Sequence, residues 1–169
     1  MRRRPAAPMP NEQPVVIGLI SDTHGLVRPG VHTALAGVSF ILHAGDVCGE
    51  DVLDELALIA PVDAVAGNMD RRDDPRLAAE LLRDVNGVRI HVSHGHEIGE
   101  PHPDALAAQY DADVIVYGHT HRALIAKIGD RLVVNPGAAG PRRFNLRPSV
   151  ARLTIADGAA DVVIVPLDA

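Results

Sequence analysis

Short apolar runs separated by polar breaks recur along the chain, and they predict strands. Residues 15–20 form a continuous apolar run without alternation, which is typical of a strand buried on both faces. Similar runs predict strands over residues 38–42, 62–66, 88–92 and 113–117. Helical spacing of apolar residues predicts helices over residues 31–36, 51–60 and 104–110. Strands that alternate with helices in the first half of the chain favour an α/β fold.

The second half of the chain is mostly strand by the same criterion. Residues 77–85 have helical propensity, but the Asn86-Gly87 pair that follows is a strong hairpin signal, so we expect a strand on each side of it. The last four predicted strands read as a meander and cover residues 123–128, 132–135, 150–155 and 162–165. A strand–helix half followed by a meander predicts two sheets packed face to face, with helices outside.

The composition limits the domain organisation and the cellular setting. Residues 1–13 are rich in proline and predict a disordered tail, and residues 14–169 are long enough for one domain. A net charge of −6 argues against bulk nucleic-acid binding. No apolar run approaches the ~18 residues of a membrane span, so no membrane association is expected. The single cysteine, Cys48, fits a reducing compartment and predicts a cytoplasmic protein.

Polar side chains follow the predicted strands at the points where these end. In open α/β sheets the carboxyl ends of the strands form the edge where ligands bind. Carboxylate and imidazole ligands together suit Mn, Fe, Co, Ni or Zn better than Mg or Ca. The candidate metal ligands are Asp22, His24, Asp46, Asn68, His94, His119 and His121.

These seven residues divide into two ligand sets if Asp46 is shared between two ions. Two divalent ions about 3.5–4 Å apart stabilise an in-line displacement at phosphorus and lower the pKa of a bound water. A set with one bridging carboxylate and mostly neutral ligands leaves positive charge for the phosphoryl oxygens. Arg142 and Arg143 are candidate ligands of the substrate phosphate, or alternatively residues of a solvated loop.

The order of these motifs resembles the calcineurin-like metallophosphoesterases, and most of all their small YfcE-type phosphodiesterase branch. The resemblance runs from about residue 14 to 169 and rests on Asp22-Thr23-His24, Gly45-Asp46, Gly67-Asn68-Met69-Asp70, His94-Gly95-His96, Gly118-His119-Thr120-His121 and Asn135-Pro136-Gly137. It implies a four-layer αββα sandwich of two mixed sheets with a binuclear metal site, most often holding Mn²⁺. It also implies that Asp22, His24, Asp46 and His121 hold one ion, and that Asp46, Asn68, His94 and His119 hold the other.

The expected reaction is hydrolysis of a phosphodiester, and possible hydrolysis of a phosphomonoester, by a metal-bridging hydroxide that Asn68 orients. Two positions depart from the family pattern. Met69 stands where many members have a histidine that protonates the leaving group, so His96 becomes a substitute candidate for the catalytic acid. Ala138 stands where the family usually has a serine.

A second hypothesis is a protein-interaction scaffold like the retromer subunit Vps29, which resembles the same family. A scaffold would tolerate broken ligand sets, and all seven candidates are present here, which favours the enzyme. The expected partner is a small phosphodiester, and the edge strands leave a homo-oligomer open. His43 and His91 are expected in the core or behind the ligands as supporting residues, His32 and His102 at the surface, and Cys48 as a small buried residue.

Overall fold

The structure is a computed structural model that describes residues 13–167, so the tail predicted over residues 1–13 lies outside the described residues except for its last residue. Three α-helices are formed by Pro29–Ala34 (α1), Glu50–Ala57 (α2) and Pro103–Gln109 (α3). A short 3₁₀-helix covers His96–Ile98 (η1), which the sequence analysis did not predict. Among the helices of residues 13–167, none combines the length and the hydrophobicity that crossing a bilayer requires.

Eleven strands form two mixed sheets. One sheet has the order β11-β10-β1-β2-β3-β4 and the other has the order β5-β6-β7-β9-β8. The strands are Val15–Ile20 (β1), Phe40–His43 (β2), Val62–Val65 (β3), Leu77–Ala78 (β4), Leu81–Val85 (β5), Val88–Val92 (β6), Val114–Val116 (β7), Leu124–Ile128 (β8), Arg131–Asn135 (β9), Ser149–Ala156 (β10) and Ala159–Pro166 (β11).

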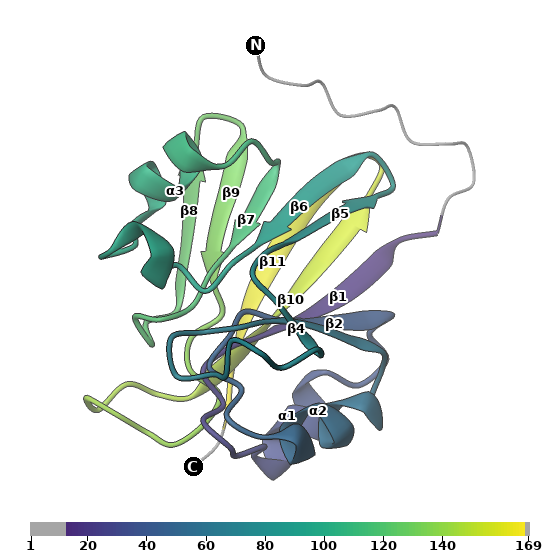
Figure 1. The fold of residues 1–169 in the computed structure, drawn as a ribbon. Coiled ribbons are helices and arrows are strands. Elements are labelled where there is room, and N and C mark those ends of the chain that lie inside the picture. Colours follow the sequence, from purple (N-terminus) through teal and green to yellow (C-terminus); the bar gives the residue numbers. More distant parts are fainter. Residues whose placement is uncertain (1–12, 168–169) are drawn as a thin grey trace.

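Apolar side chains form three core regions, which define four layers. The largest core lies between the two sheets, and the other two lie between a sheet and its covering helices. Figure 1 shows α1 and α2 together on the first sheet and α3 on the far side of the second. The α/β sandwich of two mixed sheets expected from the sequence is therefore confirmed.

The continuous apolar runs are strands with both faces buried. In β1, Ile17 and Leu19 contribute to the core between the sheets, whereas Ile20 contributes to the core under α1 and α2. In β7, Val114 and Val116 face the other sheet and Ile115 packs with α3. Successive side chains of a strand point to opposite faces, so a run without polar alternation is needed wherever both faces are covered.

The second half of the chain contains one expected feature, a hairpin, and one unexpected feature, the pairing of its last strands. The hairpin at Asn86-Gly87 is confirmed, with φ of 47° and 85° at its two central residues. The last four strands, however, are not one meander: β8 and β9 belong to the second sheet, whereas β10 and β11 complete the first. β10 pairs with β1 antiparallel along most of its length. The hydrophobic periodicity of a strand indicates which of its faces is buried, but it does not indicate which other strand it pairs with.

Candidate metal centre

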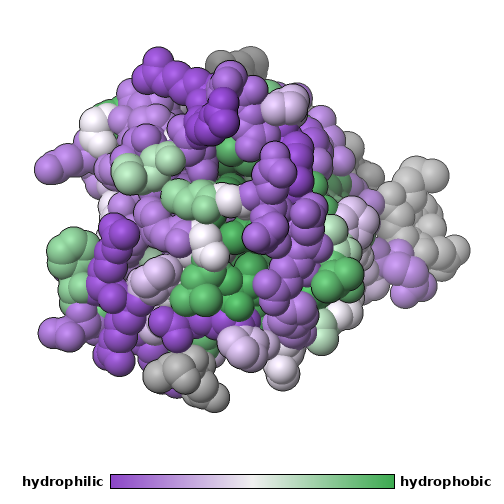
Figure 2. All heavy atoms as spheres, turned by 60° about the horizontal axis from the view of Figure 1, so that its bottom comes forward, coloured by the Kyte–Doolittle hydropathy of each residue, from purple (hydrophilic) through white to green (hydrophobic). Residues whose placement is uncertain are grey.

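The seven candidate ligands lie at the carboxyl ends of five strands. Loops that follow β1, β2 and β3 in one sheet meet loops that follow β6 and β7 in the other. These strand ends point toward the bottom of Figure 1. Figure 2 brings that side forward and shows hydrophilic side chains around a smaller hydrophobic area. Both sheets thus contribute residues to one site.

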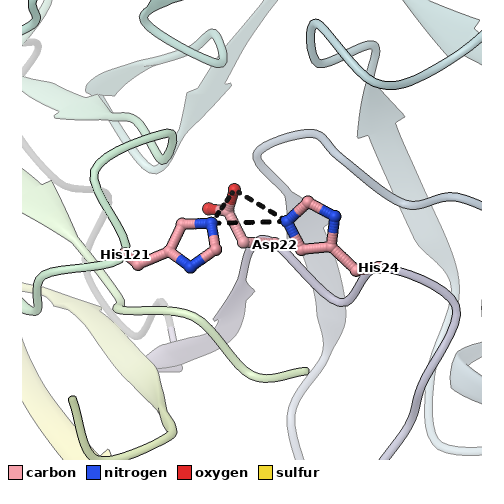
Figure 3. A group of neighbouring side chains, drawn as sticks. All are labelled: Asp22, His24 and His121. Atoms are coloured by element: carbon pink, nitrogen blue, oxygen red, sulfur yellow. Dashed lines mark hydrogen bonds and ion pairs between the residues drawn. The ribbon is translucent and has the colours of Figure 1, made fainter. Parts of the chain in front are cut away.

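The first compact group consists of Asp22, His24 and His121, shown in Figure 3. Oδ1 of Asp22 lies 3.3 Å from Nε2 of His121 and 3.7 Å from Nε2 of His24. The two Nε2 atoms are 3.3 Å apart. Three ligand-type atoms that face one another at such distances are arranged as a metal site would require, because each can direct a lone pair to a common centre.

The second compact group consists of Asp22, Asp46 and His94. Nε2 of His94 lies 3.3 Å from Oδ2 of Asp46 and 3.9 Å from Oδ1 of Asp22. Oδ2 of Asp46 is also 3.6 Å from Nε2 of His24. Asp22 is therefore common to both compact groups, and Asp46 contacts an imidazole from each, whereas the sequence analysis singled out Asp46 alone as the shared residue.

Asn68 and His119 lie at the rim of this cluster. Oδ1 of Asn68 accepts a hydrogen bond from Nδ1 of His119 at 3.2 Å, and the Asn68 side chain is exposed. The His119 ring packs edge-on against His94, with ring centroids 5.2 Å apart. The structure therefore brings both rim residues to the second group, with more solvent contact than the buried ligands have.

The backbone at the site is in the left-handed region at six residues that are not glycine. Their φ values lie between 45° and 70°, and they are Asp22, His24, Asp46, Cys48, His119 and His121. This region is uncommon for residues with a Cβ and costs of order 1–3 kcal/mol each, and it concentrates at functional sites. Here it turns the chain sharply after β1, β2 and β7, so that ligands from these three loops point into one centre.

Two glycines allow the loops to approach closely. A Cβ at Gly67 would clash with the backbone and side chain of Asp46, and a Cβ at Gly118 would clash with Ser21 and with Oδ2 of Asp22 at 2.6 Å. Both glycines stand directly before candidate ligands in the sequence, Asn68 and His119. A glycine immediately before a polar strand end was therefore a usable signal of close packing between loops.

Buried polar groups behind the ligands fix their orientation. Nδ1 of His94 donates to the carbonyl oxygen of Ala44 at 2.8 Å, which places the proton on Nδ1 and leaves the Nε2 lone pair facing the carboxylates. The His43 ring is held between the Gly45 amide, which donates to Nδ1, and Oγ1 of Thr23, 2.9 Å from Nε2. Burial lowers the pKa of His43 to about 4, so this ring supports the site as a neutral group.

Asp70 and Asn135 are two supporting residues that the candidate list did not include. The Asp70 carboxylate accepts hydrogen bonds from the amides of Val47, Cys48 and Gly67, at 2.8–3.1 Å, and so ties two ligand loops together. Asn135 donates to the carbonyl of Gly118 at 3.1 Å. Both occur in the quoted motifs, and a polar residue fully buried at a strand end, such as Asn135, is itself a sign of such a role.

Charge at the centre is concentrated on the two carboxylates. Burial tends to raise the pKa of Asp22, but contacts with His121 and His24 hold that pKa below its ordinary value. Burial tends to lower the pKa of His94, but the carboxylates of Asp46 and Asp22 raise it. Two ionised carboxylates at a cluster of imidazoles form a centre that attracts a cation.

The residues fit a metal site by a further criterion. Oδ1 of Asp22 and Nε2 of His94 are fully buried and have no hydrogen-bond partner among residues 13–167, although both face the centre. A buried polar atom without a partner is costly, and a metal ion bound between such atoms would remove that cost. The donor set of imidazoles and carboxylates suits transition metals and zinc.

The other candidates lie around this centre. The His96 ring is half-buried, with its centroid 5.3 Å from that of His94. Met69 is 64% exposed and only its amide contacts the site, by donating to Oδ1 of Asp46. Arg142 and Arg143 are exposed on the loop before β10. Cys48 is half-buried, not buried as expected, and its Sγ lies 3.7 Å from Nδ1 of His24.

The remaining histidines lie where the sequence analysis expected them. His91 is buried, stacks on Tyr110 and bonds to Oε2 of Glu80 at 2.7 Å. His32 pairs with Glu55 at the surface, and the exposed His102 accepts a hydrogen bond at the start of α3. None of these three takes part in the cluster of candidate ligands described above.

Comparison with known proteins identifies the class. A family model described as the calcineurin-like phosphoesterase superfamily domain matches residues 15–158, so the chain belongs to this superfamily. It is 35% identical over 150 residues to a probable metallophosphoesterase of Methanothermobacter thermautotrophicus, covering 83% of this chain and 81% of the relative. It is 29% identical over 141 residues to the phosphodiesterase MJ0936 of Methanocaldococcus jannaschii, covering 72% of this chain and 82% of the relative.

A solved structure with the same fold adds an independent comparison. The crystal structure of Vps29 of Entamoeba histolytica complexed with Zn²⁺ is similar at a TM-score of 0.71 and 26% identity, covering 91% of this chain and all of that one. The chain is therefore similar in sequence to a protein named as a phosphodiesterase and in fold to proteins named for vacuolar protein sorting.

Proposed function

We propose that this protein is a metal-dependent phosphodiesterase with two divalent ions, which also accepts some phosphomonoesters. The observation that carries the proposal is the convergence of two buried carboxylates and four imidazoles from both sheets on one centre. Hydrolysis adds water across one P–O bond and gives a phosphomonoester and an alcohol. When bound, two divalent ions stabilise charge on the phosphoryl oxygens and lower the pKa of a coordinated water.

The proposed ligand sets follow the order of the loops. Asp22, His24, Asp46 and His121 hold one ion, and Asp46, Asn68, His94 and His119 hold the other. Oδ2 of Asp46 supports the bridging role, because it lies 3.3 Å from His94 and 3.6 Å from His24. We propose Mn²⁺ as the preferred ion, with Fe, Co, Ni or Zn as alternatives, since each set combines two oxygen ligands, which suit Mn²⁺, with two imidazoles, which suit the other ions.

The surrounding residues take the remaining roles. Asn68 lies at the rim with an exposed amide, which can orient the attacking water. His96 is the imidazole next to the ligand cluster and is the proposed donor of a proton to the leaving group. Arg142 and Arg143 are proposed to bind the substrate phosphate, because two exposed guanidinium groups precede β10 close to the site.

The first prediction tests the centre itself. Asp46→Asn and His94→Ala each remove a ligand and should lower Mn²⁺-dependent hydrolysis of bis(4-nitrophenyl) phosphate by about 10³-fold, since several kcal/mol of charge stabilisation is lost. His32→Ala is the matched control, because it removes an imidazole that pairs with Glu55 at the surface. Circular dichroism checks that each variant is folded. Full activity in either ligand variant would contradict the proposal.

A protein-interaction scaffold is the second candidate, favoured by the likeness to Vps29 of Entamoeba histolytica. The same experiment separates the two functions. A wild-type protein that binds Mn²⁺ in calorimetry but hydrolyses neither phosphodiesters nor phosphomonoesters would support the scaffold.

We further propose a small phosphodiester as the substrate and a cytoplasmic location. The location is proposed because the chain has one cysteine, which fits a reducing compartment. A homo-oligomer remains a proposal, which light scattering can test.

A further inference from the structure

The four aromatic side chains of the chain have very different environments. Tyr117 is 2% exposed within the core under α3, and Phe40 packs against the core between the sheets. Tyr110 stacks on His91, with ring centroids 3.7 Å apart, and its hydroxyl donates to Glu97. Phe144 is 79% exposed. Among the aromatic residues, all of which lie in the described part of the chain, only Phe144 presents most of its ring to solvent.

Phe144 lies in a segment of unusual charge. Residues 141–147, here called the arginine loop, contain three arginines and no acidic residue, although the whole chain carries a net charge of −6. Arg142 and Arg143 directly precede the ring. An exposed aromatic ring beside guanidinium groups is the combination with which proteins stack bases and neutralise phosphates in single nucleotide strands.

The arginine loop begins at the candidate metal centre. The amide of Ala139 donates to the carbonyl of Ser21 at 2.9 Å, and that of Gly140 donates to the carbonyl of Asp22 at 3.2 Å. Phe144 is four residues from Gly140, so its Cα lies within about 14 Å of that anchor. In Figure 1 this loop, between β9 and β10, projects at the lower left of the molecule.

The start of the arginine loop packs tightly on the loop that carries Asp22. A Cβ at Gly140 would clash with the carbonyl oxygens of Thr23 and Asp22, and the Gly140 carbonyl accepts a hydrogen bond from Nε of Arg28 at 3.0 Å. The arginine loop is therefore anchored beside the first compact group of candidate ligands.

The tip of the loop has a conformation that turns the ring outward. Phe144 and Asn145 both lie in the left-handed region, with φ of 54° and 57°. The Leu146 amide donates to the Arg143 carbonyl at 2.9 Å and closes the turn. Left-handed backbone at two successive residues with side chains costs free energy, and burial of the ring does not offset that cost here. The same conformation keeps the ring accessible for stacking.

We propose that the arginine loop is a substrate subsite for nucleoside phosphodiesters. The base of the substrate stacks on Phe144, and Arg142 and Arg143 contact the phosphate that enters the metal centre. This inference rests on the proposed function and narrows its substrate class. It assigns Phe144 to substrate selection and not to the chemistry of hydrolysis.

The test compares a substrate with bases and a substrate without rings. Kinetics of the full chain with Mn²⁺ are measured for the dinucleoside monophosphate adenylyl-adenosine and for glycerophosphocholine. Phe144→Ala should raise KM for adenylyl-adenosine about tenfold with little change in kcat, because one stacked base is lost. The KM for glycerophosphocholine should not change. Phe144→Trp should retain low KM, whereas Phe144→Leu, apolar but without a ring face, should behave like Phe144→Ala.

Several outcomes would overturn the subsite. Equal effects of Phe144→Ala on both substrates, no effect on either, or full function of Phe144→Leu would each contradict stacking. If the wild type hydrolyses bis(4-nitrophenyl) phosphate but not adenylyl-adenosine, the hydrolase stands and the nucleoside subsite is rejected. If it hydrolyses none of the three esters, the proposed hydrolase fails, and calorimetric binding of adenylyl-adenosine then decides the subsite, since binding unchanged in Phe144→Ala rejects it. Sedimentation with anionic vesicles that depends on Phe144, without any effect on adenylyl-adenosine, would assign the loop to a membrane surface instead.

Discussion

The buried and the rim ligands of the candidate metal centre differ in how firmly the protein holds them. Asp22, Asp46 and His94 are buried, whereas Asn68 is exposed and His119 is half-buried. The buried ligands have fixed partners: Oδ2 of Asp22 accepts hydrogen bonds from the Ser21 hydroxyl at 2.6 Å and from the His119 amide at 3.1 Å. The rim side chains bond chiefly to each other. The difference indicates that the inner half of the centre (Asp22, Asp46 and His94) is preorganised, whereas the rim half (Asn68 and His119) can adjust.

This contrast has a physical reason. Inner ligands must keep like charges close together in a dry environment, and only a surrounding network of donors makes that tolerable. In the proposed function the rim ligands would meet substrate and water, and a rigid network around them would obstruct entry. Substitutions in the two halves should therefore differ in size of effect, and the following predictions run from the largest effect to the smallest.

The largest loss of activity should come from removing the inner carboxylate of Asp22, and a smaller loss should come from removing the rim amide of Asn68. Asp22→Asn removes a charge common to both compact groups and should lower Mn²⁺-dependent kcat/KM by about 10³-fold. Asn68→Ala removes one neutral rim ligand and should cost about 10- to 100-fold. Both values come from steady-state kinetics on bis(4-nitrophenyl) phosphate. Equal losses would remove the distinction between the inner and rim halves.

An intermediate effect should come from the support behind the inner half. Asp70→Asn replaces an acceptor of three backbone amides, from Val47, Cys48 and Gly67, with a group that also donates. Loosening two ligand loops should weaken Mn²⁺ binding about tenfold in calorimetry. Asp73→Asn is the matched control, because Asp73 pairs with Arg71 at the surface. Similar affinities for the two variants would show that the Asp70 contacts do not position the ligands.

The smallest effect on activity should come from His43, whose role is visible in stability. Burial lowers its pKa to about 4, from an ordinary value of 6.5, so the folded state favours the neutral ring. Its contribution is present above pH 6.5 and is lost as the pH falls toward 4, a change of about 3 kcal/mol. Protonation of Nδ1 would place a proton against the donating Gly45 amide.

Urea unfolding of the metal-free wild type and of His43→Leu measures this difference at several pH values. His43→Leu should be less stable than the wild type at pH 7.5, because two buried hydrogen bonds are lost. The gap should shrink by about 3 kcal/mol by pH 4. A gap that stays constant over this range would mean that His43 does not titrate on unfolding.

The sequence predicted the fold class and the positions of its strands more completely than the pairing of those strands. The apolar runs located β1 and β7, because a strand covered on both faces must lack polar alternation. The Asn86-Gly87 pair located a hairpin from its turn chemistry alone. Residues 77–85 were ambiguous between helix and strand. The partner of β10 was not predictable, since pairing across more than a hundred residues depends on tertiary packing.

Within the site, the sequence identified which residues meet but not how they are held. Asp22, His24 and His121 were expected to share a centre and lie within contact of one another. A supporting role was one of the two expected for His43, which accepts a hydrogen bond from the Gly45 amide. Asp70 stood in a motif, but residue type does not say which backbone amides its carboxylate binds. The sequence analysis also did not predict that Asp22 belongs to both compact groups, because that depends on the direction of one carboxylate oxygen.

The left-handed backbone of the ligand loops has a consequence for protein engineering. These carboxylate and imidazole groups could not be transferred to the strand ends of another sandwich by copying residue types alone. An extended backbone would point each Cβ in a different direction. The receiving protein would also need the same sharp turns and the same glycines before the ligands, which leave room for the neighbouring loops. The smallest part that could be transferred to another protein is therefore the loop in its left-handed conformation together with its ligand residue.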